Sequence, residues 1–243
     1  MEPDGSNQQN YVTSQDASGP RWSPDKSKIA FIISCDGVAF IDADGSNYYQ
    51  IATDGAKDAI ALSFCKSNVS FSPDGQRIVY EGTGLVVVNI DGSNPVQITD
   101  GVGYHKAPDW HPDGSKIIFE KIPPDDPGNS DLYTVEPDGS NLTRLTDKDG
   151  DDRGPRWSPD GSKVLYTFAS KLWIMDADGN NQAELSQANP IYSRSSAWSP
   201  DGSRIAMTRY ISPAANEVGM MNSDGTNHVD ISLASNDDFA GDW

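Results

Sequence analysis

The fold is decided by one stretch of the chain, Gly154-Pro-Arg-Trp-Ser-Pro-Asp-Gly-Ser-Lys-Val-Leu-Tyr-Thr167, which is followed by Leu172-Trp-Ile-Met-Asp-Ala-Asp-Gly-Asn-Asn181. Copies of it recur through the 243 residues and align on one aromatic position, occupied by Trp22, Phe71, Trp110, Trp157, Trp198 and Trp243. Successive aromatics are 49, 39, 47, 41 and 45 residues apart. Self-similarity at this period is typical of a propeller or a solenoid.

Each copy predicts four short strands separated by tight turns. The aromatic residue is followed by a turn such as Ser158-Pro-Asp-Gly161, in which Pro presets φ and the small polar residue accepts a hydrogen bond, as a type I turn requires. Two runs rich in β-branched and aromatic residues come next, Lys163–Tyr166 and Leu172–Met175, and a last strand ends near Leu185. Such runs between Asp-Gly turns indicate an antiparallel meander, with strands A to D in each unit.

A four-stranded sheet of such short strands cannot bury both of its faces alone, so the copies must stack on one another. Arranged radially, they predict an all-β fold, a β-propeller with strand A at the axis. No window sustains apolar residues at helical spacing, and the 22 Gly and 16 Pro residues interrupt every candidate helix.

Counting strands predicts five complete repeats and a partial sixth blade. Six A-type aromatics end with Trp243 and six D-type segments begin with Gln9–Thr13, but only five B–C pairs lie between them. We expect residues 1–243 to form a single domain in which the two termini share the sixth blade. Unpaired edges there would favour self-association. Because Met1–Asn7 matches Val135–Asn141 in mid-repeat, we expect the chain to be a fragment of a longer one.

The combination of Trp157-Ser-Pro-Asp-Gly-Ser-Lys-Val164 with Met175-Asp-Ala-Asp-Gly179 resembles the TolB-type, WD40-like β-propeller repeat. The resemblance covers nearly the whole chain. It implies the fold and several roles, because the repeat is found in periplasmic TolB-like proteins, in propellers that precede prolyl-oligopeptidase-type hydrolases, and in some polysaccharide lyases. The Gly-x-Ser-x-Gly elbow of the hydrolases does not occur in the sequence.

The charge balance is strongly acidic, with 18 Lys and Arg against 36 Asp and Glu and a net charge of −18. Such a field repels a phosphate backbone, so we expect no nucleic-acid partner. Five of the acids lie in the Pro-Asp turns and eight more in the second set of turns. Both sets fall at one end of the propeller, and turn chemistry together with solubility accounts for them.

The sequence carries no run approaching the roughly 20 apolar residues that span a bilayer, so no membrane insertion is expected. Its first residues lack the basic and apolar regions of a signal peptide. We expect a periplasmic or extracellular location, with the export signal outside this chain. Cys35 and Cys65 fall at the same end of the propeller. They form either a disulfide, compatible with an oxidising compartment, or two buried thiols.

The predicted binding surface is the face that carries the B–C and D–A loops, because these loops vary while the A–B and C–D turns do not. Just before each central strand, at the mouth of the axial channel, the chain places charged and aromatic residues. The candidate ligand-binding residues are Lys66, Tyr104, His105, Lys106, Asp152, Arg153, Tyr192, Arg194, Asp238 and Phe239. Radial symmetry would gather them into a pocket suited to sugars or peptide ends. The alternative is a set of solvated loop residues and inter-blade ion pairs.

A metal interpretation rests on Asp147, Asp149 and Asp151, whose carboxylates alternate as a calcium ligand set would. The Gly and the distal Glu of a calcium loop are out of register, so calcium is the weaker interpretation and no other cofactor is expected. The three histidines lie at different positions of the repeat, which disfavours a transition-metal site.

The sequence therefore predicts a non-catalytic binding module that recognises a protein, peptide or glycan through the B–C/D–A face. The alternative is a polysaccharide-active enzyme of lyase type, in which His105, Lys106, Arg153 and Arg194 would supply a base and neutralising cations. Resemblance to the oligogalacturonate lyases would also imply a metal-binding histidine cluster, which is not visible in the sequence.

Overall fold

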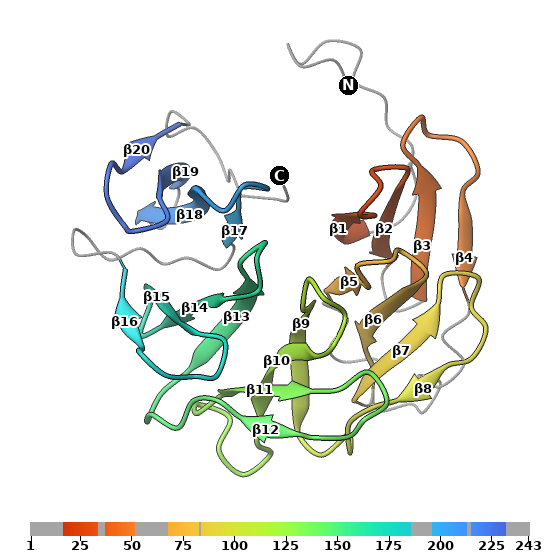
Figure 1. The fold of residues 1–243 in the computed structure, drawn as a ribbon, viewed down its shortest axis with the longest axis horizontal. Coiled ribbons are helices and arrows are strands. Elements are labelled where there is room, and N and C mark those ends of the chain that lie inside the picture. The colour runs from red at the N-terminus through yellow and green to blue at the C-terminus, as the bar shows by residue number, and fades with distance from the viewer. Residues whose placement is uncertain are drawn as a thin grey trace.

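The computed structural model describes residues 17–33, 37–51, 68–82, 84–185, 196–212 and 215–231. Its 20 strands form five antiparallel sheets, each made of four strands that are consecutive in the chain. The five sheets stand as blades around a common axis, in chain order (Figure 1). The prediction of an all-β propeller with four-stranded blades is therefore confirmed.

In chain order the strands are β1 (Ala17–Trp22), β2 (Lys28–Ile33), β3 (Gly37–Asp42), β4 (Tyr49–Ile51), β5 (Val69–Phe71), β6 (Arg77–Glu81), β7 (Leu85–Asn89), β8 (Val96–Gln97), β9 (Tyr104–Trp110), β10 (Ile117–Ile122), β11 (Asp131–Val135), β12 (Thr143–Arg144), β13 (Asp152–Trp157), β14 (Lys163–Phe168), β15 (Lys171–Asp176), β16 (Ala183–Glu184), β17 (Ser196–Trp198), β18 (Arg204–Ser212), β19 (Ala215–Asn222) and β20 (Val229–Asp230). The first strand of each sheet lies at the axis and ends at the aromatic position of the repeat.

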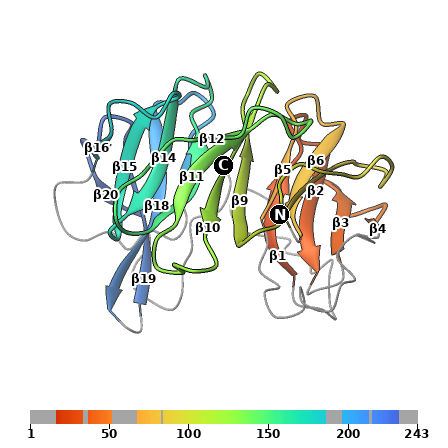
Figure 2. The ribbon, with the colours of Figure 1, turned by 90° about the horizontal axis from the view of Figure 1, so that it is seen from below.

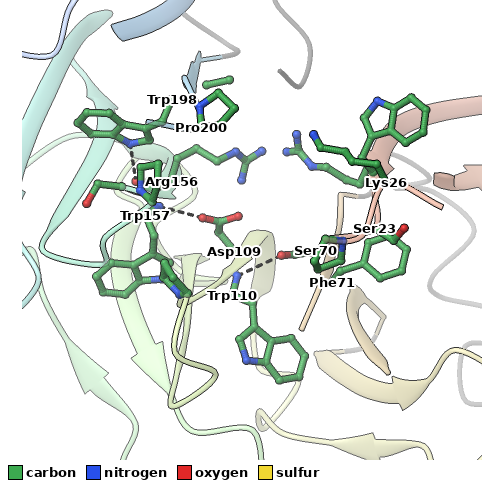
Figure 3. A pocket seen from close by; sticks show the side chains of 17 residues that line it. Ser23, Lys26, Ser70, Phe71, Asp109, Trp110, Arg156, Trp157, Trp198 and Pro200 are labelled. Atoms are coloured by element: carbon green, nitrogen blue, oxygen red, sulfur yellow. Dashed lines mark hydrogen bonds between the residues drawn. The ribbon is translucent and has the colours of Figure 1, made fainter. Parts of the chain in front are cut away.

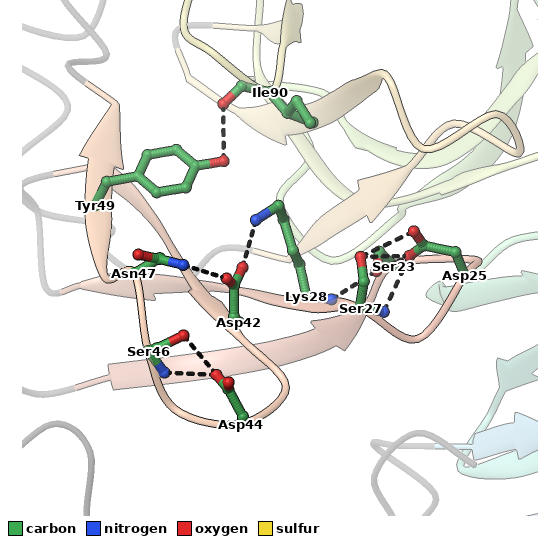
Figure 4. A network of polar contacts seen from close by, with 10 residues as sticks. All are labelled: Ser23, Asp25, Ser27, Lys28, Asp42, Asp44, Ser46, Asn47, Tyr49 and Ile90. Atoms are coloured by element: carbon green, nitrogen blue, oxygen red, sulfur yellow. Dashed lines mark hydrogen bonds and ion pairs between the residues drawn. The ribbon is translucent and has the colours of Figure 1, made fainter.

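The turns after the inner strands have the predicted chemistry. In the first blade the Lys26 amide donates to the Ser23 carbonyl oxygen (2.9 Å), which closes the turn. The Asp25 carboxylate accepts hydrogen bonds from the Ser23 hydroxyl (2.6 Å) and the Ser27 amide (3.0 Å) (Figure 4). These bonds, led by the one from Ser23, lower the pKa of Asp25 to about 2. The turn acids are thus held by local hydrogen bonds.

The second turn of the first blade repeats this pattern with a charge pair added. Asp42 pairs with the ammonium group of Lys28 and accepts a hydrogen bond from the Asn47 side chain (2.7 Å). Beyond the turn, the Tyr49 hydroxyl donates to the Ile90 carbonyl oxygen of the second blade (3.3 Å). The turn that Asp42 stabilises is therefore followed directly by a hydrogen bond from the first blade to the second.

The hydrophobic core lies between the blades. Val79 and Leu85 of the second blade pack in one cluster with Trp110 and Phe119 of the third. The equivalent cluster between the third and fourth blades is made by Ile118, Leu132, Trp157, Val164, Tyr166 and Met175. The second, third and fourth blades therefore bury both of their faces against their two neighbours, as the strand lengths require.

In two of these seams a cation lies over the aromatic ring. The guanidinium group of Arg77 lies 5.0 Å from the Trp110 ring centroid, and the Lys116 ammonium lies 5.6 Å from the Trp157 ring centroid. In each pair the cation comes from one blade and the aromatic ring from the next, an arrangement that adds electrostatic attraction to apolar contact.

The first and fifth blades differ from the others at the faces that have no described neighbour. Trp22 is 37% exposed, whereas Trp110 and Trp157 are each 5% exposed. At the other end, Ile231 is 54% exposed, whereas its repeat equivalent Ile98 is 4% exposed. Trp22 and Ile231 are exposed because each of their equivalents is buried by contact with a neighbouring blade, and the described part of the chain supplies no such blade at these two faces.

Several predictions fall on residues outside the described ranges. These include the partial sixth blade, with Gln9–Thr13 and the strand that ends at Trp243, and the pairing of Cys35 with Cys65. Within the described part of the chain, no helix is long and apolar enough to cross a membrane.

The seams predict different costs for the same substitution at two repeat positions. Trp157→Ala should lower the free energy of unfolding by about 3–5 kcal/mol, because it leaves a cavity between two blades. Trp22→Ala should cost less than about 2 kcal/mol, because this side chain is already partly solvated. Chemical denaturation of both variants measures the difference. Equal losses would mean that the core is misassigned.

Candidate functional site

The inner strands run from one open face of the ring to the other. They begin at the face of the B–C and D–A loops, here the loop face, and end at the face of the tight turns, here the turn face. In the side view of Figure 2 the strands span the distance between these faces, and the β18–β19 hairpin extends beyond the other blades at the loop face. A ligand can therefore approach the axis from either of two mouths.

At the loop face, three of the predicted residues reach the surface. Tyr104 is 38% exposed at the start of β9, and the Lys106 ammonium lies 5.5 Å from its ring centroid. Arg153, at the start of β13, has a side chain that is 53% exposed and pairs with Asp151. The mouth thus presents one aromatic surface and two cations, from neighbouring blades.

Two other predicted residues are buried in the seams. The His105 side chain is 1% exposed, with its ring 5.5 Å from Phe119. Burial, assisted by Lys121, lowers the pKa of His105 to about 4, so the ring is neutral at pH 7. Asp152 occupies the equivalent place in the fourth blade, 1% exposed, and burial raises its pKa to about 6. The remaining predicted residues lie outside the described ranges: Lys66, Tyr192, Arg194, Asp238 and Phe239.

Bulges in the inner strands explain this division. In β9 and β13 the pairing register shifts at Ala107-Pro108 and Gly154-Pro155, where Ala107 and Gly154 have φ of 50° and 58°. Proline can occupy a bulge because the bulged residues do not donate a backbone hydrogen bond to the neighbouring strand, and proline has no N–H to donate. The extra residue puts His105 on the same side of β9 as Trp110, five positions later.

Two glutamates that sequence reasoning missed, the half-buried Glu81 and the buried Glu120, hold these bulges. Glu81, at the end of β6, accepts a hydrogen bond from the Ala107 amide of the next blade (2.7 Å). Glu120 in β10 is 6% exposed, and the Gly154 amide of the next blade bonds to it. Burial raises the pKa of both carboxyls to about 7, against the influence of Lys106 on each. The available signal was an acid at one repeat position, directly after Tyr80 and Phe119 in apolar strands.

Of the candidate calcium ligands Asp147, Asp149 and Asp151, the last has partners within the protein. Asp151 accepts a hydrogen bond from the Ser130 hydroxyl (3.2 Å) and pairs with Arg153. Across the described ranges, no group of three or more His, Cys, Asp or Glu side chains is arranged to hold a metal ion.

A pocket of about 370 Å³ opens on the axis at the turn face, and residues from all five inner strands line it (Figure 3). The axial position is the residue just before each aromatic: Arg21, Ser70, Asp109, Arg156 and Ala197. This position varies in charge while its neighbours repeat, a signal that could have identified the pocket from the sequence alone.

Two of these axial residues bind the next blade. The Ser70 hydroxyl accepts a hydrogen bond from the Trp110 amide (3.1 Å), and the Asp109 carboxylate accepts one from the Trp157 amide (2.8 Å). The side chain that faces the axis in one blade therefore fixes the inner strand of the following blade.

Comparison with known proteins agrees with this architecture. A family model, the TolB beta propeller domain, matches residues 1–167 and 38–238, so the chain belongs to the TolB β-propeller family. No match was found among curated proteins.

Solved structures give the same fold at low sequence identity. A TolB-like protein from Agrobacterium tumefaciens is 20% identical with a TM-score of 0.77, covering 90% of this chain and 81% of that one. A chain of a nidogen/laminin complex is 14% identical with a TM-score of 0.70, covering 89% and 79%. An oligogalacturonate lyase from Vibrio parahaemolyticus is 15% identical with a TM-score of 0.66, covering 92% and 68%.

The buried Glu120 predicts a loss of stability as the pH rises. A carboxyl whose pKa is about 7 in the folded state, against an ordinary 4.5, stabilises the fold fully below pH 4.5 and loses this contribution as the pH passes 7. Glu120→Gln keeps the acceptor oxygen without the charge. It should match the wild type at pH 4.5 and exceed its unfolding free energy at pH 8 by about 1–3 kcal/mol. Urea titrations at both pH values measure this, and a variant that is less stable at pH 8 would contradict it.

Proposed function

We propose that this protein is a non-catalytic binding module that recognises a protein, peptide or glycan through its loop face. The observation that carries the proposal is the group formed by Tyr104, Lys106 and Arg153 at the loop-face mouth of the axis. An exposed aromatic ring beside cations suits the flat, polar surfaces of sugars and the backbone of peptides.

The strands that carry the loop-face residues are held in place before a ligand binds. The bulges next to Lys106 and Arg153 are held by the carboxyls of Glu81 and Glu120 in the preceding blades. Because the strands cannot shift without breaking these bonds, the side chains are positioned before a ligand arrives, which lowers the entropic cost of binding.

The lyase alternative receives less support from the described residues. A lyase needs a base that contacts the substrate, and the nearest histidine, His105, has a side chain that is 1% exposed. Glu81 and Glu120 have pKa values near neutrality, but each accepts a backbone hydrogen bond that holds a neighbouring strand. Likeness to the oligogalacturonate lyase is a likeness of fold and gives no catalytic residue.

The similar structures suggest what kind of partner and compartment to test. The nidogen/laminin complex contains a propeller of this fold in a protein assembly, which supports a protein ligand for the loop face. Membership of the TolB family supports a periplasmic or extracellular location.

We also retain the partial sixth blade as part of this proposal. The exposed Trp22 and Ile231 occupy faces that are buried elsewhere in the ring. Strands from the two termini would cover both faces, and a second copy of the chain could supply the same strands by exchange.

Removing the loop-face cations should abolish binding without unfolding the protein. Arg153→Ala and Arg194→Ala should each lose ligand binding while the melting temperature stays nearly unchanged, because surface substitutions seldom change stability by more than about 0.5 kcal/mol. A glycan array and a panel of immobilised peptides measure binding for the wild type and both variants.

Arg204→Ala, which removes an exposed arginine at the start of β18 on the turn face, is the matched control and should bind as the wild type does. Incubation with acidic polysaccharides, followed by the absorbance of new double bonds, tests turnover. Unaltered binding in both arginine variants would refute the loop-face site, and unsaturated products would establish the lyase alternative.

A further inference from the structure

The turn-face pocket is lined mainly by cations, although the protein as a whole is strongly acidic. The chain carries a net charge of −18, yet the ionisable residues that line this pocket are three cations and one acid: Arg21, Lys26, Arg156 and Asp109. The cations come from the first and fourth blades. In Figure 3 the Arg156 side chain extends into the middle of the pocket, and Lys26 belongs to the opposite wall. A concave site with a net positive lining attracts anionic ligands.

The acid in this pocket has a structural task. One oxygen of Asp109 accepts the hydrogen bond from the Trp157 amide that joins the third and fourth blades (2.8 Å). The axial Ser70 does the same for the second and third blades. Asp109 is therefore required where it stands whether or not the pocket binds anything. Arg21 and Arg156 occupy the same repeat position, and the Arg156 guanidinium donates a hydrogen bond to the Pro155 carbonyl oxygen (3.1 Å).

Apart from three serines, Ser23, Ser70 and Ser158, the remaining walls are apolar. They consist of proline rings from the tight turns and of aromatic side chains at the strand ends, including Trp22, which is 37% exposed: Pro24, Pro112, Pro159, Pro200, Trp22 and Trp198. A ligand that fits must therefore place a compact charge near the axis and apolar atoms against the rim.

We infer that the turn-face pocket binds a single carboxylate carried on an apolar group, the chemistry of a small branched-chain acid or of a peptide C-terminus. The planar guanidinium groups of Arg21 and Arg156 match the two oxygens of a carboxylate. A volume of about 370 Å³ lies within the range of small-ligand pockets. Ligands with several negative charges are disfavoured, because the rest of the protein repels them. The site lies at the opposite mouth from the loop face, so it stands or falls independently of the proposed function.

The probe pair 4-methylpentanoate and 4-methylpentanamide tests the inference, because the two differ only in the charged group. Titration followed by calorimetry and by tryptophan fluorescence should give binding of the acid at least about tenfold tighter than that of the amide. Raising the ionic strength should weaken the binding of 4-methylpentanoate and leave the binding of 4-methylpentanamide unchanged. N-acetylated peptides that end in leucine, as free acid and as amide, distinguish the sources: tighter binding of the peptide acid than of 4-methylpentanoate assigns the site to a peptide C-terminus, and the reverse assigns it to a small acid.

An exposed arginine outside the pocket provides the matched control. Arg156→Met, at the turn-face end of β13, should weaken the binding of 4-methylpentanoate by about tenfold or more, whereas Arg204→Met, at the start of β18 and outside the pocket lining, should leave it within about twofold. Arg21→Met provides a second test in case Arg156→Met unfolds, which circular dichroism would reveal. Equal binding of acid and amide, no binding of either, tighter binding of inorganic phosphate, or equal losses in Arg204→Met and Arg156→Met would overturn the inference.

Discussion

Each blade has two apolar faces and cannot bury either of them by itself. The aromatic residue at the end of each inner strand meets this constraint by packing into the seam with the preceding blade, as Trp110 does with Val79 and Leu85. Two polar interactions add to this packing at Trp110. The Arg77 guanidinium lies over its ring, and the Ser70 hydroxyl at the axis accepts a hydrogen bond from its backbone N–H. Stability of such an array is a sum over neighbours rather than over isolated blades.

The same seams position the two mouths of the axis. At the loop face, Glu81 and Glu120 hold the bulges that present Lys106 and Arg153. At the turn face, Asp109 fixes the strand that carries Arg156. The groups that join neighbouring blades therefore also orient the cations that a ligand would meet. This coupling explains why acids with structural tasks lie so close to the cations in both places.

The repeat alone was enough to predict the blades, because turn chemistry and strand composition are local. The last strand of the fourth blade was predicted to end near Leu185, and β16 ends at Glu184. Orientation within the inner strands was not predictable. A bulge at Ala107 adds one residue, so simple alternation along β9 assigns His105 to the wrong side. The axial pocket was missed although the sequence carries a signal for it, because the position just before each aromatic varies in charge while its neighbours repeat.

If every blade depends on its neighbours, the first and fifth blades must also be covered on their outer faces. Native-state hydrogen exchange tests this directly by comparing β2 and β18, the second strands of these blades, with β10 of the third blade. The account predicts similar protection in all three strands, independent of protein concentration if the termini supply the cover and only at high concentration if a second copy does. Exchange in β2 and β18 that is orders of magnitude faster than in β10 at every concentration would contradict it.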